Sequence, residues 1–138
     1  MVQSYWLPTI QAQLALNAKD AAGAITQLRN ATNFEYAFTV SNGNNSCLYS
    51  VYLRGEAYLA ARQEGAAAEF QRIIDRPGLV WNCATGALAH LELGRAYALA
   101  GKKANARAAY QDFLTLWKDA DADVPVLKEA KTEFAKLQ

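Results

Sequence analysis

The stretch VYLRGEAYLAA at Val51–Ala61 recurs as HLELGRAYALA at His90–Ala100, and AAAEFQRII at Ala66–Ile74 recurs as ARAAYQDFL at Ala106–Leu114. A pair of helical segments that recurs at a fixed interval is typical of a stacked helical array. Short polar turns that contain glycine separate the two segments of each pair, so each pair should fold back as an antiparallel hairpin. The repeat therefore predicts an all-α fold without a β-sheet.

A glycine stands at the same place in the first helix of each repeat, three residues before a tyrosine, at Gly55 and Gly94. A glycine at such a place lets a neighbouring helix approach closely. In the second helix of each repeat an alanine is followed four residues later by a large ring, Phe70 or Tyr110. We therefore expect small and large side chains to interlock within each hairpin.

These positions resemble the tetratricopeptide repeat, which has leucine, glycine, tyrosine, alanine and an aromatic residue at fixed offsets. Arg54 stands where that leucine is usual, and Val51 and His90 stand where a large aromatic residue is usual. The resemblance implies a right-handed superhelix of antiparallel hairpins. The matching residues are Gly55, Tyr58, Ala66 and Phe70 in one repeat and Leu93, Gly94, Tyr97, Ala106 and Tyr110 in the other.

The chain divides into helical units that we expect to form a single domain over residues 1–138. A degenerate hairpin is predicted at residues 4–31, with Leu7, Ile10 and Leu14 as the apolar stripe of its first helix. Two repeats follow at residues 47–76 and 87–118. A capping helix is predicted at residues 124–138, with Asp123 as its N-cap and Pro125 in its first turn.

The segments between the hairpins are longer than the tetratricopeptide unit requires. In the connection Arg76–Gly86 we expect Thr85 or Asn82 to cap the next helix and Trp81 to fill a gap between hairpins. In the connection Asn30–Ser50 the turn-rich SNGNNS sequence at Ser41–Ser46 predicts a mobile loop.

Composition excludes several classes of partner. The chain has 14 basic and 13 acidic residues, so no basic surface for nucleic acid or for an anionic membrane is predicted. No apolar run reaches the length of a membrane span, and Met1–Ala15 lacks the pattern of a signal peptide, which predicts a cytoplasmic protein. In that compartment Cys47 and Cys83 should be reduced thiols, although a disulfide between equivalent positions of adjacent repeats stays open.

The sequence contains no pattern typical of catalysis. His90 is the sole histidine and is expected to pack at a helix contact, two cysteines without a nearby histidine make no zinc set, and the glycines are dispersed rather than gathered in a phosphate loop. We therefore predict no enzyme activity, no cofactor and no metal.

A second resemblance extends over nearly the whole chain from Tyr5. The run from YLRGEAYLAARQEG to AKTEFAKLQ is similar to the carboxy-terminal repeat region of acidobacterial serine/threonine protein kinases. The resemblance implies that this chain is a regulatory or scaffolding region of such a signalling protein. Similar tails also follow the DNA-binding domains of transcriptional regulators, which is an alternative parent.

The expected function is binding of a protein or peptide segment in the concave groove formed by the first helix of each hairpin. An aromatic and apolar groove with two glutamates favours an apolar or basic segment. The alternative is a structural spacer or self-association domain without a separate ligand. The candidate groove residues are Tyr49, Tyr52, Leu53, Glu56 and Leu59 from one repeat and Leu88, Leu91, Glu92, Arg95 and Leu99 from the next.

Overall fold

A computed structural model describes residues 2–36, 38–39 and 44–137. Its elements follow one another as hairpins, and each predicted hairpin contains two helices that pack against each other. The order is η1 (Val2–Trp6), α1 (Leu7–Asn17), α2 (Ala21–Leu28), η2 (Arg29–Phe34), β1 (Phe38–Thr39), β2 (Asn44–Asn45), α3 (Tyr49–Ala60), α4 (Ala66–Ile74), α5 (Pro77–Val80), α6 (Ala84–Leu99), α7 (Lys103–Leu116) and α8 (Pro125–Ala135).

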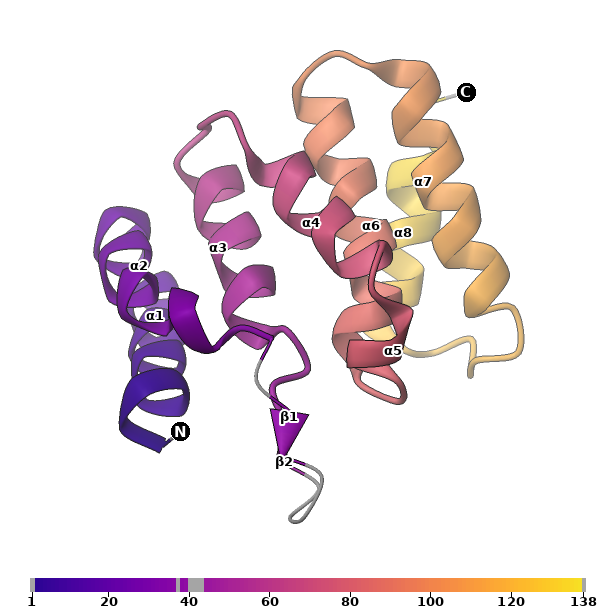
Figure 1. The fold of residues 1–138 in the computed structure, drawn as a ribbon. Coiled ribbons are helices and arrows are strands. Elements are labelled where there is room, and N and C mark those ends of the chain that lie inside the picture. The colour runs from indigo at the N-terminus through magenta and orange to yellow at the C-terminus, as the bar shows by residue number, and fades with distance from the viewer. Residues whose placement is uncertain (1, 37, 40–43, 138) are drawn as a thin grey trace.

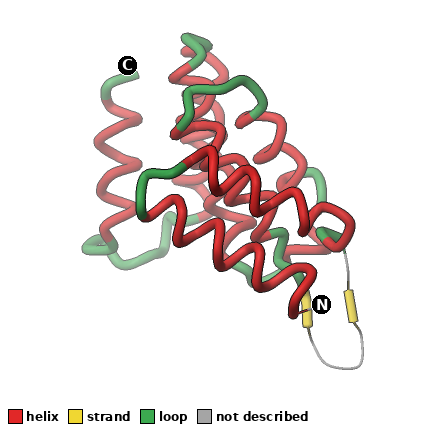
Figure 2. Tube along the Cα trace, turned by 90° about the vertical axis from the view of Figure 1, so that its left-hand side faces the viewer, coloured by secondary structure: helices red, strands yellow, loops and turns green. Residues whose placement is uncertain are grey.

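The hairpins stack in chain order. Helices α1 and α2 pair, as do α3 with α4 and α6 with α7, and neighbouring hairpins meet where α2 contacts α3 and α4 contacts α6. Figure 1 shows this succession from α1 and α2 at one end to α7 and α8 at the other, and Figure 2 shows the same helices after a quarter turn. The predicted helical fold is confirmed at this level.

The interlocking of small and large residues is the same in both repeats. A Cβ atom added to Gly55 would lie 2.6 Å from the ring of Phe70, and one added to Gly94 would lie 2.8 Å from the ring of Tyr110. Both rings are almost fully buried, as are Ala66 and Ala106 at the start of the second helices. In each hairpin the glycine therefore makes room for an aromatic ring of its own hairpin partner.

One short pair of strands departs from the prediction that no β-sheet forms. Between the first two hairpins β1 and β2 pair antiparallel, with Phe38 opposite Asn45 and Thr39 opposite Asn44. The predicted mobile turn at Ser41–Ser46 lies partly outside the described residues. Its described end is anchored, because Ser46 is buried and its hydroxyl donates to the Glu35 carbonyl at 2.6 Å.

The connection before α6 also differs from the prediction. It contains the one-turn helix α5, which begins at Pro77, and α6 begins already at Ala84. Thr85 does not cap α6, because its hydroxyl donates to the Cys47 carbonyl at 2.6 Å. Trp81 fills no gap, since 75% of it is exposed.

Helix α8 packs on the last hairpin, at the place expected for a cap. Leu127 and Ala130 are buried against Leu91, Tyr110 and Phe113 of that hairpin, and Trp117 packs at the edge of this cluster. Proline occupies the first turn as expected, but the N-cap residue is Val124 rather than Asp123, and it makes no side-chain capping bond. The polar outer side of α8 therefore closes this end of the array.

Candidate functional site

A groove of about 470 Å³ opens between the first helices of the three hairpins. One wall comes from α1 and the adjoining end of η1, the floor from α3 and the other wall from the start of α6. The residues that line it are Trp6, Thr9, Ile10, Gln13, Tyr49, Tyr52, Leu53, Glu56, Ala84, Thr85 and Leu88. The first helices of successive hairpins thus share one surface.

Five of the ten candidate residues line this groove. Tyr49 and Leu88 occupy equivalent positions in the two repeats, six residues before the contact glycine of each hairpin. Tyr52 packs its ring edge-on against Phe70, with ring centres 5.7 Å apart. Leu53 is only 5% exposed, so it supports the floor of the groove and offers a ligand little surface. Glu56 is partly exposed.

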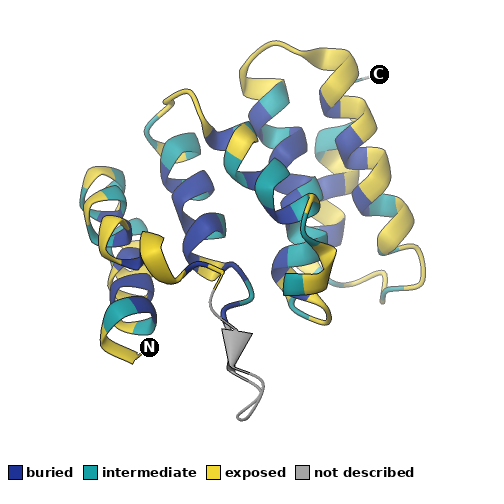
Figure 3. Ribbon diagram, in the orientation of Figure 1, coloured by how far each residue is buried: buried dark blue, intermediate teal, exposed yellow. Residues whose placement is uncertain are grey.

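Leu91, Glu92 and Arg95 do not line this groove, and lie at the contact between α6 and α8, although Glu92 and Arg95 are close enough to act on the charge of Glu56. Leu91 is fully buried in the cluster that contains Leu127, and Glu92 is 6% exposed. Their assignment to an open groove was wrong because the C-terminal helix packs on this part of α6 (Figure 3).

Arg95 is engaged within the protein. Its guanidinium binds Glu133 at 2.8 and 2.9 Å, Glu92 at 2.7 Å and Glu129 at 3.4 Å. Burial opposes ionisation of Glu133, but hydrogen bonds from Arg95 and from the Tyr110 hydroxyl outweigh it and hold the pKa of Glu133 below its usual value. Arg95 therefore attaches α8 to the array, and these contacts leave no support for the prediction that it contacts a ligand.

Leu59 and Leu99 also lie outside the groove. They line a separate hollow of about 590 Å³ at the turn ends of the second and third hairpins, together with Gly65 and Tyr97. Helical spacing put them on the same helix faces as the groove residues, but the structure divides this surface into two hollows with different linings.

The contribution of α1 was predicted incorrectly. Its buried residues are the small or short ones, Pro8, Thr9 and Ala12, while the expected core stripe is exposed. Ile10 faces the groove, and Trp6 lies beside Tyr49 with ring centres 5.9 Å apart. The sequence shows apolar residues at helical spacing, but it does not show which face of the helix packs against the core. The exposed fractions in the expected stripe are 46% for Leu7, 55% for Ile10 and 62% for Leu14.

Glu56 has an unusual environment. Burial raises its pKa to about 7, and the nearby carboxylate of Glu92 adds to this effect, while Arg95 and a hydrogen bond with Tyr52 act in the opposite direction. Burial is also the main reason why the pKa of the Tyr52 hydroxyl is raised. The groove therefore contains a carboxyl group whose ionised form is incompletely compensated by the protein.

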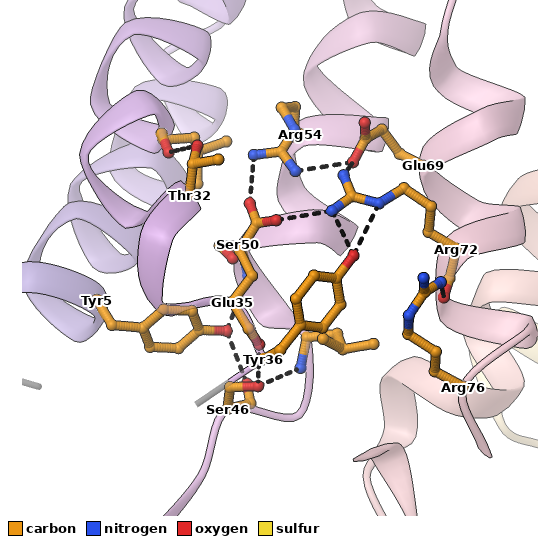
Figure 4. A network of polar contacts seen from close by, with 12 residues as sticks. Tyr5, Thr32, Glu35, Tyr36, Ser46, Ser50, Arg54, Glu69, Arg72 and Arg76 are labelled. Carbon is orange, nitrogen blue, oxygen red and sulfur yellow. Dashed lines mark hydrogen bonds and ion pairs between the residues drawn. The ribbon is translucent and has the colours of Figure 1, made fainter. Parts of the chain in front are cut away.

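A buried ion network, which the sequence reasoning missed, fixes the connection between the first two hairpins. Glu35 is 1% exposed and accepts from Arg54 at 2.5 Å and from Arg72 at 2.9 Å, and both arginines also bind Glu69 (Figure 4). Nearby, the Tyr5 hydroxyl donates to the Ser46 carbonyl at 2.8 Å. Arg54, which departs from the repeat pattern, is explained by this network.

The same network shows that the described part of the connection does not fill the groove. Glu35 and Tyr36 are held on the arginines of α3 and α4, and the residues that line the groove include none from the described parts of 30–46. A groove filled by this connection would have favoured a spacer. The described part of the connection therefore leaves the groove uncovered.

Cys47 and Cys83 form a disulfide, so the prediction of reduced thiols was wrong. Their Cα atoms lie 5.8 Å apart, just before the first turns of α3 and α6. The bridge joins the floor and one wall of the groove at the end that contains Tyr49 and Ala84. Sequence alone left the pairing open because contact between equivalent positions depends on how the hairpins stack.

Comparison with known proteins identifies no relative. No family model, no curated protein and no solved structure matches the chain. In the described part of the chain, no helix is long and apolar enough to cross a membrane. No group of three or more histidine, cysteine, aspartate or glutamate side chains is placed to hold a metal ion among the residues that the structure describes.

Proposed function

We propose that this chain is a non-catalytic binding module of the tetratricopeptide type, and that the groove between α1, α3 and α6 receives a segment of a partner protein. The observation that carries the proposal is an accessible groove lined by aromatic and aliphatic side chains on three successive hairpins. Apolar surface of this kind, rimmed by polar residues, is typical of interaction sites. Rigid helices hold the walls, so little ordering of the protein is needed on binding.

The disulfide bears on where such a module works. Protein disulfides persist in oxidising compartments and are rare in the cytosol. The proposal therefore places the module in an oxidising compartment rather than in the cytoplasm expected from the sequence. When the protein isolated from its source is alkylated and analysed by mass spectrometry, Cys47 and Cys83 should carry the alkyl group only if the protein was reduced first.

A selection from a library of random displayed peptides tests the binding proposal. Wild type should enrich related sequences, and Tyr49→Ala with Tyr52→Ala should abolish the enrichment, because aromatic side chains supply most of the apolar surface of the groove. Leu99→Ala is the matched control, since Leu99 is exposed but lines the other hollow. Equal enrichment by the groove variant, with both proteins folded, would overturn the proposal.

Self-association is the second candidate, and one observation favours it. Leu7, Ile10 and Leu14 leave an apolar stripe exposed on α1, the first helix of the first hairpin. A second copy stacked on this stripe would bury it. Sedimentation equilibrium tests this: if two copies stack through the stripe, wild type should be a dimer and the double variant Leu7→Ser with Leu14→Ser a monomer.

The parent implied by the resemblance, a serine/threonine protein kinase, stays a prediction. Reading the coding sequence upstream of the Met1 codon tests it, and a DNA-binding domain there would support the alternative parent.

A further inference from the structure

We infer that the groove takes a segment in which a lysine or arginine stands beside a large apolar side chain, and that Glu56 receives the cation. The inference rests on the proposed function, because it names the chemistry of the partner at that same groove. It follows from how apolar and charged groups are distributed along the walls.

One end of the groove is apolar and aromatic. Trp6 and Tyr49 form a tilted pair, with ring centres 5.9 Å apart, across the gap between η1 and α3. Ile10 and Leu88 extend this surface along both walls. Ile10 is 55% exposed, so a large apolar side chain of a partner would remove substantial apolar area from water.

The polar groups of the walls are largely engaged by the protein itself. The Thr9 hydroxyl donates to the Tyr5 carbonyl at 2.6 Å, and the Thr85 hydroxyl donates to the Cys47 carbonyl at the same distance. The Gln13 amide donates to the Asn17 side chain at 3.1 Å. These groups therefore offer a partner few free hydrogen bonds.

Glu56 is the one charged side chain among the described residues that line the groove. Helix α1, opposite it, contains no charged residue, and α6 brings Glu92 and Arg95 close. Arg95 forms ion pairs with Glu92, Glu129 and Glu133 and only a longer-range attraction to Glu56, so one guanidinium faces three bound carboxylates and a fourth nearby. The local excess of acid favours a cation at Glu56 and disfavours an acidic segment.

Charge also argues against a second copy of α8 as the occupant. At its own contact with α6 this helix presents Leu127 and Ala130 together with Glu129 and Glu133, which bind Arg95. In the repeat alignment Glu56 occupies the position of Arg95, one residue after the glycine. If the same face of α8 from a second copy docked in the groove, its Glu129 and Glu133 carboxylates would lie against the carboxylate of Glu56.

The experiment repeats the peptide selection with three proteins: wild type, Glu56→Gln and Glu56→Lys. Wild type should enrich peptides with lysine or arginine next to an aromatic or aliphatic residue, whereas Glu56→Lys should enrich aspartate or glutamate at that place. In a fluorescence titration, a peptide selected by wild type should bind Glu56→Gln about tenfold or more weakly, as expected for loss of a charged hydrogen bond. The matched control is Glu64→Gln, which removes a carboxylate from an exposed turn outside the groove and should leave the affinity unchanged.

The outcomes separate the two proposals. Absence of any enriched peptide family overturns the proposed function and this inference with it. An enriched family that depends on Tyr49 and Tyr52 but has no basic residue, or that is unchanged in Glu56→Lys, overturns the inference alone. A wild-type dimer that dissociates when Tyr49 and Tyr52 become alanine would show a second copy as the occupant and would also overturn the inference. Thermal melts confirm that each variant is folded.

Discussion

Two of the contacts along the array, between α3 and α6 and between α6 and α8, are built on equivalent positions but are completed differently. Where α3 faces α6, Tyr52 and Glu56 border an accessible groove. Where α6 faces α8, the equivalent Leu91 and Arg95 are covered by a helix that supplies apolar side chains and two carboxylates. Helix α8 thus docks through an apolar anchor and a charge opposite to the one at the position after the glycine, and the segment that we infer for the groove would combine the same two features.

Removal of residues 124–138 should have the largest effect, because it uncovers the contact surface of α6 that α8 occupies and leaves it open, like the groove between α3 and α6. Leu91 and Phe113 would lose their cover, and Arg95 would lose Glu129 and Glu133. An array without a polar outer face aggregates. Light scattering and thermal melting should show aggregation and a lower melting temperature. A monomeric truncated protein with an unchanged melting temperature would show that α8 is not a cap.

The disulfide joins the segments just before α3 and α6, whereas α8 is held on α6 without one. Loss of the disulfide should have the next largest effect. The bridge closes a loop with a sequence separation of 36 residues. For a loop of this length, chain entropy predicts that Cys47→Ala with Cys83→Ala lowers the free energy of unfolding by about 3–4 kcal/mol. Urea unfolding of the variant and of oxidised wild type measures the difference. A loss below about 1 kcal/mol would mean that the bridge contributes little to the folded state.

Substitution of Gly55 and of Gly94 should lower stability by similar amounts, because the packing inside the two hairpins is the same even though their outer contacts differ. Gly55→Ala and Gly94→Ala each place a Cβ within 3.0 Å of a buried ring. Overpacking of this kind costs about 1–3 kcal/mol, partly offset by the better helix propensity of alanine. In thermal melts the larger Gly94→Leu should lose more stability than either. Unequal losses from the two alanine variants would show that the hairpins pack differently.

The effects at the pair of equivalent charged positions, Arg95 and Glu56, are expected to have opposite signs. Arg95→Gln should lower the free energy of unfolding by about 1.5–3 kcal/mol, because it leaves Glu92 and Glu133 without their cation. Glu56→Gln should instead stabilise the protein by about 1–2 kcal/mol when the pH is well above the folded-state pKa of about 7, since partial burial opposes ionisation of Glu56.

The pH dependence follows from the raised pKa of Glu56. Below its ordinary value of 4.5 the carboxyl group is protonated in both states and has no effect on the free energy of unfolding. Between 4.5 and about 7 ionisation of the unfolded state increasingly disfavours folding, and above about 7 the difference is constant. The gain from Glu56→Gln should therefore appear across this interval. Denaturant titrations that give the same gain below 4.5 would contradict this environment for Glu56.

The interlocking inside each hairpin could be predicted from the sequence because it depends on local spacing. Gly55 with Phe70 and Gly94 with Tyr110 are set by helical periodicity and a short turn. The partners of Arg95 could not be predicted in this way, since Glu129 and Glu133 lie 34 and 38 residues further along the chain and reach it only through the docking of α8.

Two other errors have the same origin. On α1 the buried side is the one with small residues, such as Ala12, because α2 and α3 pack closely there, and the larger Leu7 and Leu14 are left exposed. The Cys47 to Cys83 bridge depends on the stacking of two hairpins. Helical pattern determines which residues share a face, but the neighbours of that face are set by tertiary packing.

The most direct test of the central claim is to map where a selected basic peptide binds. In a nitrogen-15 chemical-shift titration, we expect the largest amide perturbations at Trp6, Tyr49, Tyr52, Glu56 and Leu88, five residues that represent the three sides of the groove. Perturbations centred on Leu59 and Leu99, or on the exposed Trp81, with the groove residues unchanged, would contradict it.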